Sequence, residues 1–218
     1  MTRTDKINHA RVASHHGGRP TPAESERISA RIMAAARKLF LRDGVAQTSM
    51  DAIAAEIGIS KRTLYSRHPG KAALFEAIVL DVVNTGLSNI VTEQLSGKTP
   101  RDKLLALSLR ILEVATDPLI ISLERVVVGE SWQFPKLASL VGQYGMPPIR
   151  EEVMAVLRDH GASEPGLARD AEIFLSITMI PQLRQAVLQR TPPGIAGIDR
   201  AALERTIDIF VRGIEMEL

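Results

Sequence analysis

The chain contains no cysteine. Disulfide bonds and zinc sites with thiolate ligands are therefore excluded. No uncharged apolar run reaches the roughly 18 residues that a membrane-spanning helix needs, so we expect no such helix. The N-terminal segment also lacks the apolar stretch of a secretory signal, which makes a cytoplasmic location the default expectation.

Enzyme motifs are missing as well. The sequence has no GxSxG, HExxH, P-loop or GxGxxG pattern, and its carboxylates are scattered without an obvious buried pair. His9, His15 and His16 gather near the N-terminus, where a charged, mobile arm accounts for them better than a metal site. We therefore expect no enzyme activity, no cofactor and no bound metal.

The composition that remains is that of a globular protein. The chain has 218 residues, of which 45% are hydrophobic and 24% are charged, enough for one or two domains with a real core. The net charge of +2 hides an asymmetry, because residues 1–70 hold 12 Lys/Arg against 6 Asp/Glu and the rest of the chain is net acidic. This split suggests an anionic partner for the first segment alone.

The apolar residues recur at helical spacing along most of the chain, and strand signals are nearly absent. Thr21, Pro22 and Glu24 have the pattern of a capping box, which predicts a first helix that ends at Asp43-Gly44. Thr48 and Ser60 are expected to cap two short helices separated by Gly58, the second reaching about Arg67. Further helices are predicted near 71–95, 101–116, 118–131, 135–144, 149–160, 166–189 and 199–216, with Pro181 inside one of them.

The fold class is therefore predicted as all-α, with about nine to ten helices. The sequence predicts a flexible basic arm at residues 1–20, a three-helix domain at residues 21–70 and a larger helical domain at residues 71–218. The helix from residue 71 would link the two domains.

The segment 48–71, TSMDAIAAEIGISKRTLYSRHPGK, has the pattern of a helix-turn-helix, whose second helix enters the major groove of DNA. That helix begins at Ser60, carries Lys61, Arg62 and Arg67, and has no acidic residue before Pro69. Its N-terminal dipole end suits phosphate. A solvated basic surface helix is the simpler alternative for a lone Lys-Arg pair, but the cap, the glycine turn and the short helices together favour DNA binding.

From about Ser25 to Val82 the sequence resembles the DNA-binding domain of TetR-family transcriptional regulators. The residues that carry the resemblance are Ile32, Ala35-Ala36, Leu39-Phe40, Gly44, Thr48-Ser49-Met50, Ile53-Ala54, Ile57-Gly58-Ile59-Ser60, Thr63-Leu64-Tyr65, Lys71 and Leu74-Phe75. The resemblance implies that Thr48, Tyr65 and Lys71 contact the DNA backbone. It also implies that Ser49, Lys61, Arg62 and Thr63 face bases or phosphates, and Arg62 is the candidate for base reading because arginine–guanine pairing is the commonest specific contact.

Two positions are less clear. The family usually has an aromatic residue where this chain has His68, which we interpret as a tolerated edge histidine rather than a pH or metal switch. Arg19, in the sequence Gly18-Arg19-Pro20, could enter the minor groove as the arms of other DNA-binding domains do, or could belong to a disordered tail.

The resemblance further implies a ligand pocket and a dimer interface in the C-terminal helices. The last two predicted helices each carry an apolar stripe, the first with Ile173, Ile177, Ile180 and Val187 and the second with Leu203, Ile207, Phe210 and Ile214. These stripes would pack against the same helices of a second subunit as a four-helix bundle, or would serve only the core of one subunit. The aromatic-rich stretch 129–146 suggests Trp132, Phe134, Tyr144 and Met146 as pocket residues. Phe174 and Met179 are further candidates for the lining, and Arg110, Glu113 and Gln182 could supply polar groups. Each of these residues could instead be plain core or surface.

The expected function is thus a homodimeric repressor that leaves a palindromic double-stranded DNA operator when a hydrophobic or amphipathic small molecule binds. A DNA-binding regulator whose C-terminal domain binds a protein partner is the main alternative, and an all-helical enzyme is a remote one.

Overall fold

The computed structural model describes residues 21–91, 95–161 and 165–214, and this part of the chain is all-helical. It contains ten α-helices and one 3₁₀ turn, η1 (Ile195–Gly197), and no strand. The predicted fold class is confirmed. The helices are α1 (Pro22–Asp43), α2 (Met50–Ile57), α3 (Lys61–Tyr65), α4 (Lys71–Val91), α5 (Pro100–Ala115), α6 (Pro118–Glu130), α7 (Pro135–Tyr144), α8 (Met146–Arg158), α9 (Leu167–Val187) and α10 (Arg200–Gly213).

The start of α1 follows the predicted capping box. The Thr21 hydroxyl accepts from the Glu24 N–H, and the Glu24 carboxylate accepts from the Thr21 N–H. These contacts satisfy donors that the first turn of a helix leaves without an intrahelical partner. At the other end, Gly44 has a φ of +84° and stops the helix.

The cap of α2 differs from the prediction. Ser49, not Thr48, is the N-cap, and its hydroxyl accepts from the Ala52 N–H at 3.0 Å. Thr48 is one residue too early and is buried, so its hydroxyl donates to the carbonyl of Gly44 instead. Ser60 caps α3 as predicted, but α3 ends at Tyr65, two residues before the expected end.

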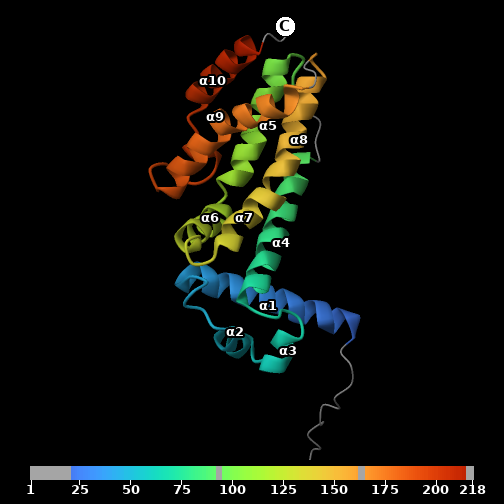
Figure 1. Ribbon diagram of the computed structural model, residues 1–218, viewed down its shortest axis with the longest axis vertical. Helices are drawn as coiled ribbons and strands as arrows, with labels where there is room; N and C mark the ends of the chain where they lie inside the picture. Colours follow the sequence, from blue (N-terminus) through green and yellow to red (C-terminus); the bar gives the residue numbers. More distant parts are fainter. Residues whose placement is uncertain (1–20, 92–94, 162–164, 215–218) are drawn as a thin grey trace, which may run out of the picture.

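The arrangement of the helices separates two ends of the molecule (Figure 1). α1 lies across the foot of the long helix α4, with α2 and α3 on its outer side. The helices α5, α8, α9 and α10 gather around the far part of α4. α6 lies beside α1, and α7 packs against α4 and α6. α4 thereby connects the small helical unit to the rest of the chain.

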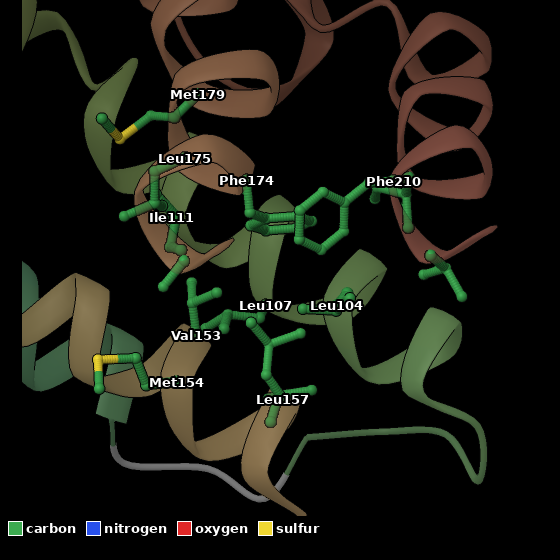
Figure 2. Close-up of a cluster of buried hydrophobic side chains, with 14 of the residues drawn as sticks. Leu104, Leu107, Ile111, Val153, Met154, Leu157, Phe174, Leu175, Met179 and Phe210 are labelled. Carbon is green, nitrogen blue, oxygen red and sulfur yellow. The ribbon is translucent and has the colours of Figure 1, made fainter. Parts of the chain in front are cut away.

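Two hydrophobic clusters correspond to these two ends. The first lies among α1 to α4 and includes Phe40, Phe75 and Leu64, and it also takes Leu123 and Val127 from α6. The second lies among α4, α5, α8, α9 and α10 (Figure 2), and Phe174 and Phe210 meet there edge to face with ring centroids 5.0 Å apart. The interior near α9 is thus filled by large side chains.

The expected dimer stripe on α10 is wrong for most of its residues. Leu203, Ile207 and Phe210 are buried in the core of their own subunit, because α10 packs this face against α5 and α9. Ile214 is partly buried against the same core. On α9 the outcome is different, since Ile173, Ile177 and Ile180 keep 42%, 39% and 45% of their surface exposed.

The helix α4 is long and apolar, although we expected no helix that could span a membrane. By length and composition alone, the Lys71–Ile90 segment of α4 could cross a membrane, with a mean hydropathy of 1.3. Leu74, Phe75 and Ile78 of this segment are nevertheless buried in the first hydrophobic cluster. A core helix of a soluble protein meets the same criterion, so α4 is weak evidence for a membrane span.

Candidate nucleic-acid interface

α2 and α3 form a helix-turn-helix unit on the outer side of α1 (Figure 1). Ile53 and Ala54 of α2 and Leu64 of α3 are buried against the first hydrophobic cluster. Between the helices, Gly58 is in the left-handed region with φ +67° and ψ +38°, a conformation that favours glycine. This turn joins α2 to α3 within three residues, and Leu64 faces the core while Lys61, Arg62 and Tyr65 are exposed.

Contacts from α1 fix α2 in place. The Arg31 guanidinium donates to the carbonyl of Ile57 at the C-terminal end of α2. Lys38 forms a 2.7 Å ion pair with Glu56. Two cations of α1 therefore bind its neighbour α2, which the sequence alone did not indicate.

The exposed side of α3 presents Lys61, Arg62 and Tyr65. Lys61 forms an ion pair with Asp51 of α2, but both side chains are more than half exposed, so water and salt weaken this pair. The Arg62 side chain is exposed and makes no ion pair or hydrogen bond within the described part of the chain. Tyr65 is 49% exposed. A ligand could therefore bind Arg62 of α3 without breaking an existing side-chain contact.

Three of the hydroxyl groups predicted to contact DNA have local partners. The Ser60 hydroxyl accepts from the Thr63 N–H at 3.1 Å, and the Ser60 and Thr63 hydroxyls lie 2.8 Å apart. Ser49 caps α2 in the same way. These hydroxyl groups are exposed or half-buried at the N-termini of α2 and α3. They can therefore face an anion and cap the helices at the same time.

Three other predicted contact residues serve the scaffold. Thr48 is buried, as described above. The Arg67 guanidinium lies against α1 and donates to the Ser29 hydroxyl at 2.7 Å and to the hydroxyl and carbonyl of Ser25. The Lys71 ammonium donates to the carbonyls of Val45 and Ala46 at 2.8 and 2.9 Å. Arg67 therefore does not point outward as expected, because α3 ends before it.

A shallow groove of about 420 Å³ runs between the α1–α2 turn and the start of α4. It brings together Ser49, Tyr65 and Lys71, which the resemblance assigned to DNA. Gln47, an exposed residue of the turn, also lines the groove and was missed. A polar residue just before a helix cap carries no distinctive sequence signal. Arg19 lies outside the described residues.

His68 lies at the edge of this unit. Its backbone N–H donates to the carbonyl of Leu64, and its side chain is half-buried. Burial, and to a smaller extent the nearby charge of Arg67, lowers the pKa of His68 below its ordinary value. Both causes favour the neutral imidazole, as expected for a packed edge residue.

A second cavity, the α4–α5 cleft, lies where α1, α4, α5 and α6 meet. It has a volume of about 510 Å³. Apolar groups come from Val82, Val114, Leu119 and Ile120, and charged groups from each of α1, α4 and α5, including Arg37 and Asp81. Of the predicted pocket residues, Arg110 and Glu113 line this cleft.

The other seven predicted pocket residues do not line the α4–α5 cleft, so the prediction does not hold for them at this site. Trp132 is 95% exposed. Phe174 and Met179 are buried in the second hydrophobic cluster, and Met146 packs against it. Phe134 packs against the first cluster, and the Tyr144 hydroxyl contacts Glu76 at 3.4 Å. Gln182 is half-buried on α9. The aromatic density of a segment does not say which side of its helices is enclosed.

Comparisons with known proteins give consistent matches. Residues 32–78 match the family model of bacterial regulatory proteins of the tetR family, and residues 102–172 match the C-terminal domain of AefR-like transcriptional repressors. No curated protein matches the chain.

Many solved structures share the fold. The Flavonoid-responsive Regulator FrrA has a TM-score of 0.71 and 26% identity, covering 86% of this chain and 97% of FrrA. A TetR-family regulator from Mesorhizobium loti has a TM-score of 0.71 and 20% identity, covering 87% and 97%. FadR from Bacillus subtilis, solved with stearoyl-CoA, has a TM-score of 0.64 and 12% identity, covering 85% and 99%.

The contacts of Arg67 and Arg62 predict effects of different size on stability. Arg67→Ala removes three hydrogen bonds between α1 and the end of α3, and we expect it to lower the free energy of unfolding by about 1–2 kcal/mol. Arg62→Ala serves as the matched control and should change it by less than about 0.5 kcal/mol. Urea denaturation followed by circular dichroism measures both, and equal stabilities would contradict the scaffold role of Arg67.

Proposed function

The chain belongs to the TetR family of DNA-binding transcriptional regulators, and from this we propose that it is a homodimeric repressor released from its operator by a small molecule. The proposal depends chiefly on one observation: the end of α3 is bonded to α1 through Arg67, while the side chain of Arg62 is exposed and has no partner among the described residues. A cytoplasmic location and the absence of enzyme activity are part of the same proposal.

On DNA, α3 would lie in the major groove with Arg62 reading a base edge. A guanidinium can bond the two acceptors of guanine at once, which makes it the best base-reading group that α3 offers. Tyr65 and the helix N-termini at Ser49 and Ser60 would contact phosphates and fix the position of the protein. Lys71 would contribute positive charge from the groove while it holds the turn.

Dimerisation would bring two such units to one operator. The exposed isoleucines of α9 form a continuous apolar stripe at helical spacing, which a second copy of the same helix would cover. A two-fold symmetric dimer matches a palindromic operator, with recognition helices roughly 34 Å apart or a multiple of it.

The α4–α5 cleft is the proposed effector site. Its volume of about 510 Å³ lies within the range of small-molecule pockets. Its apolar residues and charged residues suit an amphipathic molecule, and the name of the relative FrrA, which is flavonoid-responsive, supports this class. Since α4 carries the DNA-reading unit at its foot, a ligand that favours another tilt of α4 would lower DNA affinity by a population shift.

A second candidate function keeps DNA binding but replaces the small molecule by a protein partner. Trp132 and Val128, both largely exposed near the end of α6, favour it, because exposed apolar groups of this size often mark interaction sites.

The DNA-binding proposal is tested with fragments selected from genomic DNA by the purified protein. Arg62→Ala should weaken binding to the best fragment about 10- to 100-fold and reduce sequence preference at one position of each half-site. Arg158→Ala, which removes an exposed arginine of α8, is the matched control and should bind normally. Fluorescence anisotropy at two salt concentrations measures both, and a wild-type protein without sequence preference would refute the proposal.

The dimer proposal is tested with Ile177→Glu. A buried, unpaired carboxylate should prevent association, so this variant should sediment as a monomer and bind the operator at least about tenfold more weakly. Val128→Glu places the same charge at another exposed apolar residue and should remain dimeric. A dimeric Ile177→Glu variant would exclude α9 as the interface.

The effector site is tested by filling the cleft. Compounds that release wild-type protein from DNA would be identified by anisotropy and then applied to Thr85→Trp, whose new side chain occupies the cleft. The concentration for release should rise at least about tenfold, since each lost apolar contact weakens binding. Thr206→Trp is the matched control, because both threonine hydroxyls bond the carbonyl four residues earlier. Unchanged release from Thr85→Trp would exclude this cleft.

A further inference from the structure

The last residue of α6 contacts the turn between α1 and α2. Glu130 Oε1 accepts a hydrogen bond from the backbone N–H of Ala46 at 3.1 Å, in a partly buried position. The two residues are 84 positions apart in the sequence. A carboxylate of the C-terminal helices is therefore bonded directly to the backbone of the DNA-reading unit.

Gly44 makes this approach possible. A Cβ atom at residue 44 would lie 2.6 Å from Glu130 Oε1, closer than real Cβ contacts allow. The φ of +84° at this residue also favours glycine. Gly44 thus ends α1 and leaves the space that the carboxylate of Glu130 occupies.

The same turn is held from its other side. The Lys71 ammonium of α4 donates to the carbonyls of Val45 and Ala46, and the Val45 side chain is only 1% exposed. The Thr48 hydroxyl donates to the carbonyl of Gly44 at 2.7 Å. These contacts fix the backbone just before Ser49, the cap of α2. Glu130 is the residue among these partners that follows α4 in the sequence.

α6 joins this contact to the α4–α5 cleft. Leu119 and Ile120, in its first turn, line the cleft, and Glu130 is about 15 Å further along the helix axis. Between them, Arg125 donates to the carbonyls of Ala186 and Val187 at the end of α9. One short helix therefore contacts the cleft, α9 and the α1–α2 turn.

We propose that Glu130 is a positioning residue for DNA binding: its carboxylate holds the α1–α2 turn so that α2 and α3 fit the operator. The inference rests on the proposed function and adds a route for its regulation. A ligand in the cleft that displaces the first turn of α6 would move Glu130 away from Ala46 and release the turn, because a helix of this length moves as a rigid body.

The sign of the effect separates positioning from simple electrostatics. Glu130 places a negative charge near the DNA-reading unit, so removing the charge alone should strengthen DNA binding. Removing the hydrogen-bond acceptor should weaken it. Glu130→Gln removes the charge and keeps an acceptor oxygen, whereas Glu130→Ala removes both.

The experiment compares the two variants with Glu151→Ala, a matched control at an exposed glutamate of α8. Hydrogen exchange of the Ala46 amide is measured without DNA, and operator affinity is measured by anisotropy. In Glu130→Ala the amide should exchange about tenfold faster, and operator affinity should fall about tenfold, since a partly buried donor loses its partner. Glu130→Gln should restore both, and thermal unfolding checks that all variants are folded.

Wild-type affinity in Glu130→Ala, or affinity lost equally in Glu130→Gln, would overturn the positioning role. Unchanged exchange of the Ala46 amide would overturn the contact itself. A wild-type protein that binds no DNA would refute the proposed function and this role with it, and the exchange measurement would still report whether Glu130 holds the turn.

Discussion

The packing of α1 across α4 is the contact on which the other features of this protein depend. Phe40 and Phe75 are fully buried there and meet edge to face, with ring centroids 5.8 Å apart. α1 carries α2 and α3 on its outer side, and α4 continues into the second hydrophobic cluster. Because protein interiors are close-packed, a change in the angle between α1 and α4 must move α3 as a unit.

Near this contact, polar residues that are close in the sequence have different structural roles. Arg62 and Arg67 are five positions apart, yet one faces solvent and the other is bound to the serines of α1. Lys71 and Thr48 hold the α1–α2 turn, while Ser49 caps α2. Residues that match the family pattern, such as Thr48 and Lys71, therefore also stabilise the shape of the helix-turn-helix unit.

The C-terminal helices divide their apolar residues in a comparable way. Both α9 and α10 have apolar stripes of helical period, and in sequence the two stripes look alike. In the fold, α10 buries its stripe within the subunit. α9 packs against α5, α6, α8 and α10 through other residues, such as Phe174 and Leu175, and its isoleucine stripe stays exposed. This difference makes α9 the candidate surface for a second subunit.

The sequence by itself determined the local structure: the helices, most of their ends and the helix-turn-helix unit. Capping, glycine turns and apolar period act between residues a few positions apart, so Thr21, Gly58 and Ser60 could be interpreted without the fold. Only the tertiary structure decided which side chains face inward. The bond from Glu130 to Ala46, the inward position of Arg67 and the lining of the α4–α5 cleft join residues that are distant in sequence. Such contacts depend on how whole helices pack, and a single sequence carries no direct signal for that.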